Sequence, residues 1–163
     1  MNFNQFDSLL PPQAAERAAE VGVGKATKAP IKSFLLAISA GLHIGIAFIF
    51  YTTVTTGAGD LPWGITRLIG GLAFSLGLIL VVVTGGELFT SSVLTLVARA
   101  SGKISWQALI KNWFVVYFGN MVGALLLVAC MLVTKQYMFD HGQVGLNAMA
   151  ISQHKLHHGF FAA

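Results

Sequence analysis

Cysteine and charge are the scarcest features of this chain, and each scarcity excludes a class of protein. Cys130 is the one cysteine among the 163 residues, so we expect neither a disulfide within the chain nor a thiolate metal site. Asp, Glu, Lys and Arg make up only 10% of the residues, against about 25% in soluble domains. Hydrophobic residues reach 55%, and the mean hydropathy is +0.73. A soluble domain of this length cannot bury so much apolar surface, so we predict an all-α integral membrane protein.

The few charges also argue against a nucleic-acid partner. Lys and Arg outnumber Asp and Glu by 10 to 6, which gives a formal net charge of +4. The basic residues flank apolar stretches instead of gathering on one soluble face, a pattern typical of membrane topology. We therefore expect membrane lipid, and no nucleic acid, around this chain. The first residues also lack the order of basic, apolar and small residues that marks a signal peptide.

Three long apolar stretches predict membrane spans at 34–55, 63–98 and 112–134. Before them, residues 13–21 are strong helix formers, and Gly22 and Gly24 are expected to end that helix. Its alanine-rich composition favours a docking or interfacial helix. We expect residues 135–153 to form a polar loop and residues 160–163 to begin a fourth span. The predicted division is a cytoplasmic helical segment, 1–30, followed by a channel domain, 31–163, and the chain resembles a fragment of a longer protein.

Basic residues near the span ends predict the orientation. One end of the predicted bundle collects six of them: Lys25, Lys28, Lys32, Arg99, Lys103 and Lys111. The other end has Asp60, with Arg67 and Lys135 as its nearby bases. By the positive-inside rule, the N-terminus and the second loop are cytoplasmic, which suits a multi-pass protein of the inner membrane.

The second stretch, 63–98, is too long for a single crossing. As one helix it would reach roughly 54 Å, against a hydrocarbon core of about 30 Å. Its second half contains Gly85-Gly86-Glu87 and the hydroxyl cluster Thr90-Ser91-Ser92. Irregular backbone at membrane depth survives only where it is buried in protein or lines an aqueous path. We therefore predict a broken helix, with a merely kinked helix as the alternative.

The helix that resumes after the break predicts an anion site. It would start near mid-membrane, where its free N–H groups and partial positive charge point into the protein. Thr90, Ser91 and Ser92 are residue types that cap such an end, and together they make a candidate anion site. Glu87 complicates this prediction, because an ionised acid would repel an anion. We expect Glu87 either to accept backbone N–H bonds within the loop or to stay neutral.

Other polar and small residues within the spans have mainly structural interpretations. Small residues recur at four-residue spacing, which predicts close helix packing at Gly41, Gly45, Gly119 and Gly123. Asn120 is expected to bond across helices, with a role in the pore as the alternative. His43 is a functional candidate by its depth, although a bond to a neighbouring backbone would also explain it.

A basic cluster leads toward the expected fourth span. His154, His157 and His158 have a spacing that suits a metal, but no carboxylate or cysteine nearby completes a site, so we expect no metal and no cofactor. Lys155 lies between them. An ammonium group at a pore mouth raises the local anion concentration, and we assign that role to Lys155.

Several motifs in the same order along the chain resemble one known family. They are Lys25-Ala26-Thr27-Lys28, Gly85-Gly86-Glu87-Leu88-Phe89-Thr90, Lys111-Asn112-Trp113, Tyr117-Phe118-Gly119-Asn120 and His154-Lys155-Leu156-His157-His158. These motifs resemble the formate–nitrite transporter family, and within it the formate channels of bacteria. The resemblance covers essentially the whole chain. It implies a homopentamer with an aquaporin-like fold of six spans per subunit in two inverted repeats, of which this chain supplies the first repeat and the start of the second.

The resemblance also implies roles for individual residues. The segment 85–92 matches the family's omega-shaped loop, and Leu78, Leu88 and Phe89 match positions that line constrictions. Phe74 matches an aromatic residue on the outer side of the path. Thr90 matches a loop threonine that faces a central histidine, which in the family belongs to the second repeat. The family's N-terminal helix is implicated in gating.

These observations favour a channel, and not an enzyme, for small monovalent anions, formate first. Nitrite or hydrosulfide conduction is the alternative within the family. A neutral-solute channel of the aquaporin type is an alternative from another class, although its paired Asn-Pro-Ala motifs are absent. An intramembrane metal enzyme built on the histidine cluster is a third possibility. A structural or assembly protein is the remaining alternative.

Overall fold

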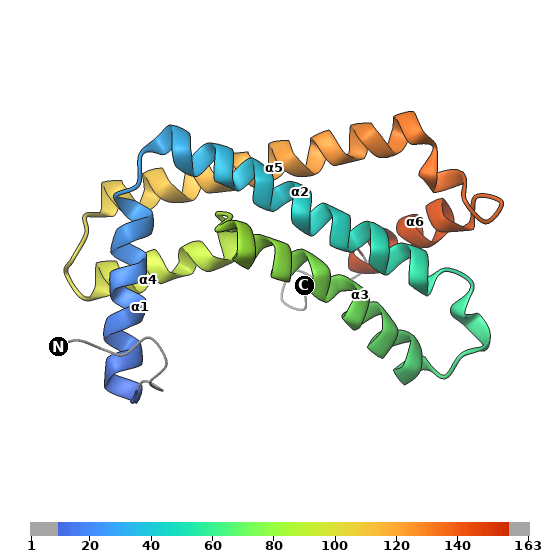
Figure 1. Cartoon of the computed structure of the whole chain (residues 1–163), viewed down its shortest axis with the longest axis horizontal. Coiled ribbons are helices and arrows are strands. Elements are labelled where there is room, and N and C mark those ends of the chain that lie inside the picture. The colour runs from blue at the N-terminus through green and yellow to red at the C-terminus, as the bar shows by residue number, and fades with distance from the viewer. Residues whose placement is uncertain (1–9, 157–163) are drawn as a thin grey trace.

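The computed structural model describes residues 10–156, and within that range the protein is helical with no β-strand (Figure 1). The α-helices are α1 (Pro11–Ala26), α2 (Pro30–Thr55), α3 (Trp63–Thr84), α4 (Leu94–Ala100), α5 (Trp106–Thr134) and α6 (Gln143–Leu156). Short 3₁₀ turns lie between them: η1 (Ala58–Asp60), η2 (Phe89–Val93) and η3 (Gln136–Met138). The predicted all-α class is confirmed. The expected turn at residues 160–163 lies outside the described residues.

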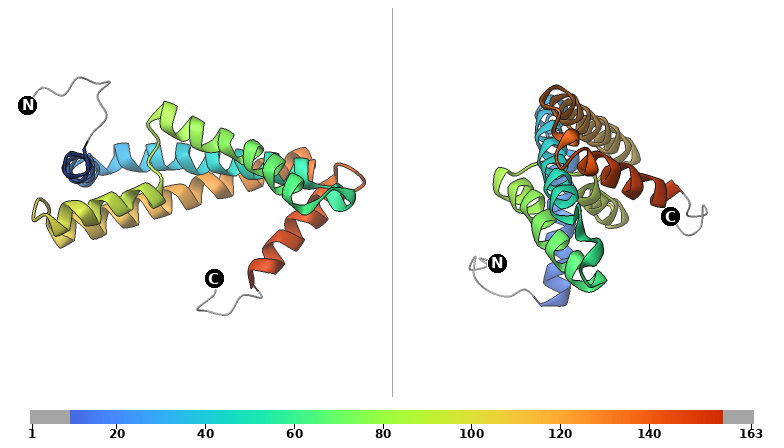
Figure 2. Two further views of the ribbon diagram at one scale, coloured as in Figure 1. Left: turned by 90° about the horizontal axis from the view of Figure 1, so that it is seen from below. Right: turned by 90° about the vertical axis from the view of Figure 1, so that its right-hand side faces the viewer.

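Three of these helices, α2, α3 and α5, are long and apolar enough to cross a membrane. In Figure 1 the chain runs along α2, returns through α3 and α4, and runs forward again along α5. The α1 end of the bundle therefore also holds the turn between α4 and α5. The opposite end holds η1, η3 and α6. Figure 2 shows the same arrangement from two further sides, with α6 turned away from the long helices.

Helix α2 is the central element, because it packs against both α5 and α3. A Cβ on Gly41 would lie 2.3 Å from the carbonyl oxygen of Asn120, and one on Gly123 would lie 2.1 Å from that of Ile38. Such distances exclude any side chain, so the two backbones touch directly. The predicted role of the spaced glycines in close helix packing is confirmed within this chain.

Helix α1 lies across the end of the bundle and packs against α4. The prediction that Gly22 and Gly24 end this helix is wrong, because α1 continues to Ala26. Gly22 is a point of close approach instead: a Cβ there would lie 2.2 Å from the carbonyl oxygen of Leu94. Gly24 has no atom within 4 Å of such a Cβ. A glycine inside a helix destabilises it, and the tight packing of α1 against α4 offsets this destabilisation.

Two predicted boundaries are wrong at the other end of the sequence. The third span begins at Trp106, six residues before the predicted start, because the Ser105 side chain caps it by accepting a hydrogen bond from the Ala108 N–H at 3.2 Å. The segment 135–153 is not a loop throughout, since α6 begins at Gln143. The Asn147 amide nitrogen of α6 lies 3.0 Å from the Thr52 carbonyl oxygen, which fastens α6 to the end of α2.

Candidate functional site

The break in the second stretch follows Thr84, where α3 ends in a tight reversal. Gly85 adopts a left-handed conformation with φ of 65°, which a residue with a Cβ rarely occupies. Its N–H donates to Val82, and the next N–H, of Gly86, donates to Val81 at 2.8 Å. These bonds satisfy carbonyl groups at the end of α3. The broken helix is confirmed, and a kinked continuous helix is excluded.

Asn120 holds the open part of the break from the middle of α5. Its side-chain oxygen accepts from the Phe89 N–H at 2.8 Å. Its amide nitrogen donates to the carbonyl oxygens of Glu87, at 2.9 Å, and of Ala37, at 2.8 Å. One side chain therefore satisfies backbone groups of the break and of α2 together. The predicted bonding of Asn120 across helices is confirmed.

Glu87 is the most deeply buried acid of the described residues, with 2% of its surface exposed. Its side chain pairs with the ammonium groups of Lys25, at 2.5 Å, and of Lys28. Both lysines come from the end of α1 and the turn that follows. The expectation that Glu87 accepts backbone N–H bonds within the loop is wrong. Its own N–H donates to the Leu36 carbonyl oxygen at 3.2 Å, which fixes the backbone of the break to α2.

This ion triad of Lys25, Lys28 and Glu87 changes the electrostatics of the break. A lone buried carboxylate would repel an anion, but two ammonium groups leave one positive charge in excess. Sequence reasoning missed the triad. The available signal was the spacing of Lys25 and Lys28, which places two cations about one helical turn apart just before the first span.

The resumed helix, η2 followed by α4, is anchored to α5 by Trp113. Its indole N–H lies 2.9 Å from the Thr95 hydroxyl oxygen and 3.2 Å from the Ser92 carbonyl oxygen. The Trp113 ring also meets the Phe89 ring edge-on, with the centroids 5.9 Å apart. Phe89 makes a similar contact with Tyr117 at 5.6 Å. Trp113 therefore positions both the backbone of the resumed helix and the side chain of Phe89.

The three hydroxyl residues lie at the start of the resumed helix in three different environments. The Ser91 hydroxyl donates to the Leu88 carbonyl oxygen at 2.7 Å. Ser92 is fully buried, and its hydroxyl has no hydrogen-bond partner among the described residues. Thr90 is exposed. The expectation that these residues cap the helix is wrong: the cap position is Leu88, no side chain bonds there, and all three lie inside the first turns.

The predicted constriction residues fall in two groups. Leu88 and Phe89 are adjacent to Thr90 in the break and are partly exposed. Phe74 and Leu78 lie four residues apart on α3, farther toward the opposite end of the bundle, where Phe74 packs edge-on against Phe48 with centroids 5.0 Å apart. Leu78 is 54% exposed. The break thus brings Leu88 and Phe89 together with the hydroxyl cluster 90–92, and α3 carries Phe74 and Leu78.

The basic cluster that contains Lys155 lies only partly within the described residues. The side chain of Lys155 lies outside the described residues, as do His157 and His158 entirely. Within the part of the chain that the structure describes, no group of three His, Cys, Asp or Glu side chains is placed to hold a metal ion.

The sequence of this chain is similar to known proteins over almost its whole length. A family model described as formate/nitrite transporter matches residues 12–163. The chain belongs to the formate/nitrite transporter family. Relatives in this family include formate channel FocA of Escherichia coli strain K12, 57% identical over 160 residues, and that of Haemophilus influenzae, 50% identical over 156 residues. These alignments cover 98% and 96% of this chain.

A solved structure shows the same fold. It is a pentameric formate channel with formate bound, with a TM-score of 0.77 and 73% identity, and the match covers 82% of this chain and 52% of that one. The prediction of an aquaporin-like helical bundle, with this chain as the repeat that carries the broken second span, is confirmed, as is a multi-pass membrane protein. The chain spans about half the length of its curated relatives, covering 56% of the E. coli protein and 55% of the H. influenzae one. The relatives named here are channels.

Proposed function

We propose that this chain forms part of a channel for small monovalent anions, formate first, with a path through each subunit. The observation that carries the proposal is the break itself: a resumed helix starts beside a positively charged ion triad. The helix start contributes a partial positive charge, and the triad adds one net charge. An anion placed there meets no uncompensated acid. The names of the relatives, formate channels, support formate as the substrate.

Within this proposal, Thr90, Ser91 and Ser92 form the anion site, and Thr90 is its leading member. Thr90 is exposed, so its hydroxyl is free to face a permeating anion, whereas Ser91 uses its hydroxyl on Leu88. Leu88 and Phe89 act as the inner constriction, while Phe74 and Leu78 narrow the path farther out. Apolar constrictions favour a small or transiently protonated species over strongly hydrated ions. Lys155 concentrates anions at the outer mouth.

The proposal also covers the protein's setting. Six basic residues lie toward the α1 end of the bundle, which supports a cytoplasmic N-terminus and an inner-membrane location. The segment 1–30 is then a cytoplasmic docking segment, and residues 31–163 belong to the channel domain. The pentameric structure with formate bound supports a homopentamer and a transport role without catalysis.

Formate flux into proteoliposomes tests the function, using the full-length protein and its Thr90→Val variant. Valine keeps the shape of threonine and removes the hydroxyl. We expect formate flux in the wild type and a decrease of about tenfold in the variant, which corresponds to the loss of about 1.4 kcal/mol of barrier stabilisation. Thr53→Val is the matched control, because the Thr53 hydroxyl donates within α2 to Ile49 at the end of the bundle.

Equal flux in Thr90→Val and the wild type would remove Thr90 from the mechanism. A wild-type protein that passes nitrite or hydrosulfide much faster than formate would transfer the proposal to that anion. A protein that passes neutral solutes and no anion would overturn it.

A further inference from the structure

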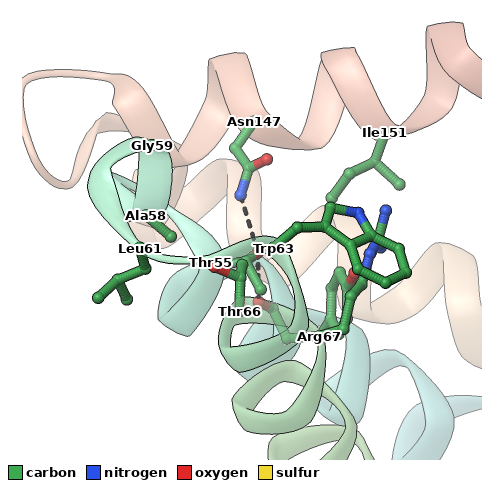
Figure 3. Close-up of a pocket in the computed structure, with 10 residues that line it drawn as sticks. Thr55, Ala58, Gly59, Leu61, Trp63, Thr66, Arg67, Asn147 and Ile151 are labelled. Atoms are coloured by element: carbon green, nitrogen blue, oxygen red, sulfur yellow. Dashed lines mark hydrogen bonds between the residues drawn. The ribbon is translucent and has the colours of Figure 1, made fainter.

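A polar cavity lies at the end of the bundle opposite α1, and Arg67, which lines it, is not among the proposed channel residues. The cavity has a volume of about 370 Å³ and forms where the end of α2, η1, the start of α3 and α6 meet. Its polar lining consists of Tyr51, Thr55, Thr66, Arg67 and Asn147. Figure 3 shows Asn147 reaching from α6 toward Thr55, with Arg67 and Trp63 on the side of Ile151.

Arg67 is held in a fixed position at this cavity. Its guanidinium donates a hydrogen bond to the Tyr51 hydroxyl at 2.6 Å. It also lies over the Trp63 ring, 5.4 Å from the centroid, which is a cation–π contact. A guanidinium has five N–H donors, and the bond to Tyr51 uses one of them. The planar group is therefore positioned with donors left for a ligand.

The cavity carries positive charge without a neutralising acid. None of the described residues that line it is Asp or Glu. The nearest acid in sequence, Asp60, is exposed and does not belong to the lining. A guanidinium in such a place suits a planar carboxylate, because two parallel N–H donors match two carboxylate oxygens. The chemistry of the lining therefore suits a small carboxylate or a similar oxyanion.

The position of Arg67 on α3 connects this cavity to the proposed path. At 100° per residue, Arg67, Phe74 and Leu78 fall within about 40° of one another around the helix axis. Phe74 follows Arg67 by two turns, which is about 10.5 Å along the helix. The cation thus lies on the same face as the two outer constriction residues, and farther toward the end of the bundle.

We propose that Arg67 and this cavity form an outer capture site, which binds the permeant carboxylate before it reaches Phe74. The inference rests on the proposed channel function and adds a ligand-binding residue to it. In this site Tyr51 is a positioning residue, because its hydroxyl accepts a hydrogen bond from the guanidinium. The site raises the occupancy of the outer mouth at low anion concentration, while the rate at saturation is set at the constrictions.

Formate flux at graded concentrations tests the site, with formate added on the side of the cavity to full-length protein in proteoliposomes. For Arg67→Gln we expect the concentration of half-maximal flux to rise about three- to tenfold while the maximal flux is unchanged. Arg67→Lys keeps the positive charge, so it should raise the concentration of half-maximal flux much less than Arg67→Gln does. Tyr51→Phe, which keeps the ring and loses the bond, should give an intermediate value. Added salt should slow the wild type at low formate more than it slows Arg67→Gln.

Arg99→Gln is the matched control, because Arg99 also lies over a tryptophan, Trp106 at 5.0 Å, but at the opposite end of the bundle. An unchanged half-saturation in Arg67→Gln, or an equal rise in Arg99→Gln, would overturn the capture site. Tryptophan fluorescence separates this outcome from failure of the channel function. A saturable response to formate that is lost in both Trp63→Phe and Arg67→Gln supports the site even in a protein that passes no formate, and a response that survives both substitutions overturns it.

Discussion

The Asn120 amide nitrogen lies 2.9 Å from the carbonyl oxygen of Glu87, a residue 33 positions earlier in the chain. The side-chain oxygen of Asn120 accepts in turn from Phe89. The two residues on either side of Leu88 are therefore held by one amide, which links the break to the middle of α5. This link makes the break testable with single substitutions.

Asn120→Leu should destabilise the protein by roughly 3 kcal/mol, because it leaves the Phe89 N–H and the Glu87 carbonyl without partners in a partly buried site. Asn120→Asp should be similarly harmful, since a carboxylate accepts from Phe89 but cannot donate to Glu87 or Ala37. Thermal unfolding in detergent measures both. Gln107→Leu, which changes an exposed amide on the same helix, should have little effect. An Asn120→Leu protein as stable as the wild type would show that the break holds its shape without this residue.

Glu87→Gln should destabilise the protein by about 3 kcal/mol, because it leaves two ammonium groups around a site without its carboxylate. Adding Lys25→Met to that variant should restore part of the loss, and a double-mutant cycle measures the coupling. Glu20→Gln is the control, since the Glu20–Arg17 pair on α1 is more than half exposed and should contribute less than about 1 kcal/mol. Additive effects of the two substitutions would contradict a coupled triad.

Gly22→Ala and Gly24→Ala should have opposite effects on α1, although they lie two residues apart. A Cβ at position 22 would lie 2.2 Å from the Leu94 carbonyl oxygen, so α1 must move off α4, at a cost of about 1–3 kcal/mol. At position 24 nothing lies within 4 Å, and alanine should stabilise the helix by up to about 1 kcal/mol. Tryptic cleavage at Arg17 and thermal unfolding report on both variants. Equal cleavage of the two would mean that α1 is not docked through Gly22.

The three spans and the break were predictable because they depend on local properties. A hydrocarbon core of fixed thickness limits the length of a span, and paired glycines beside an acid interrupt an over-long one. The glycine spacing on α2 and α5 was also sufficient to predict close packing. Each of these inferences uses residues within a few helical turns of one another.

The missed features depend on contacts between distant residues. Glu87 lies 62 and 59 positions after its two lysines, and no periodicity links them. The sequence alone predicts a helix end at Gly22, because its partner, the Leu94 carbonyl, is distant in sequence. The sequence does not predict the start of α6, because Asn147 is held by a hydrogen bond to Thr52 at the end of α2. The sequence shows the charge of Arg67, but the cavity beside it forms only when α6 is fastened to the end of α2.

The ion triad also has a consequence for the order in which the chain is made. Lys25 and Lys28 precede Glu87 in sequence, so a ribosome completes both cations long before it adds the acid. When Glu87 is added, its partners Lys25 and Lys28 are therefore already part of the chain. An unpaired carboxylate is costly to place in lipid, so counterions that precede the acid in the chain lower that cost. The end of α1 and the turn that follows it thus supply both counterions before the acid is made.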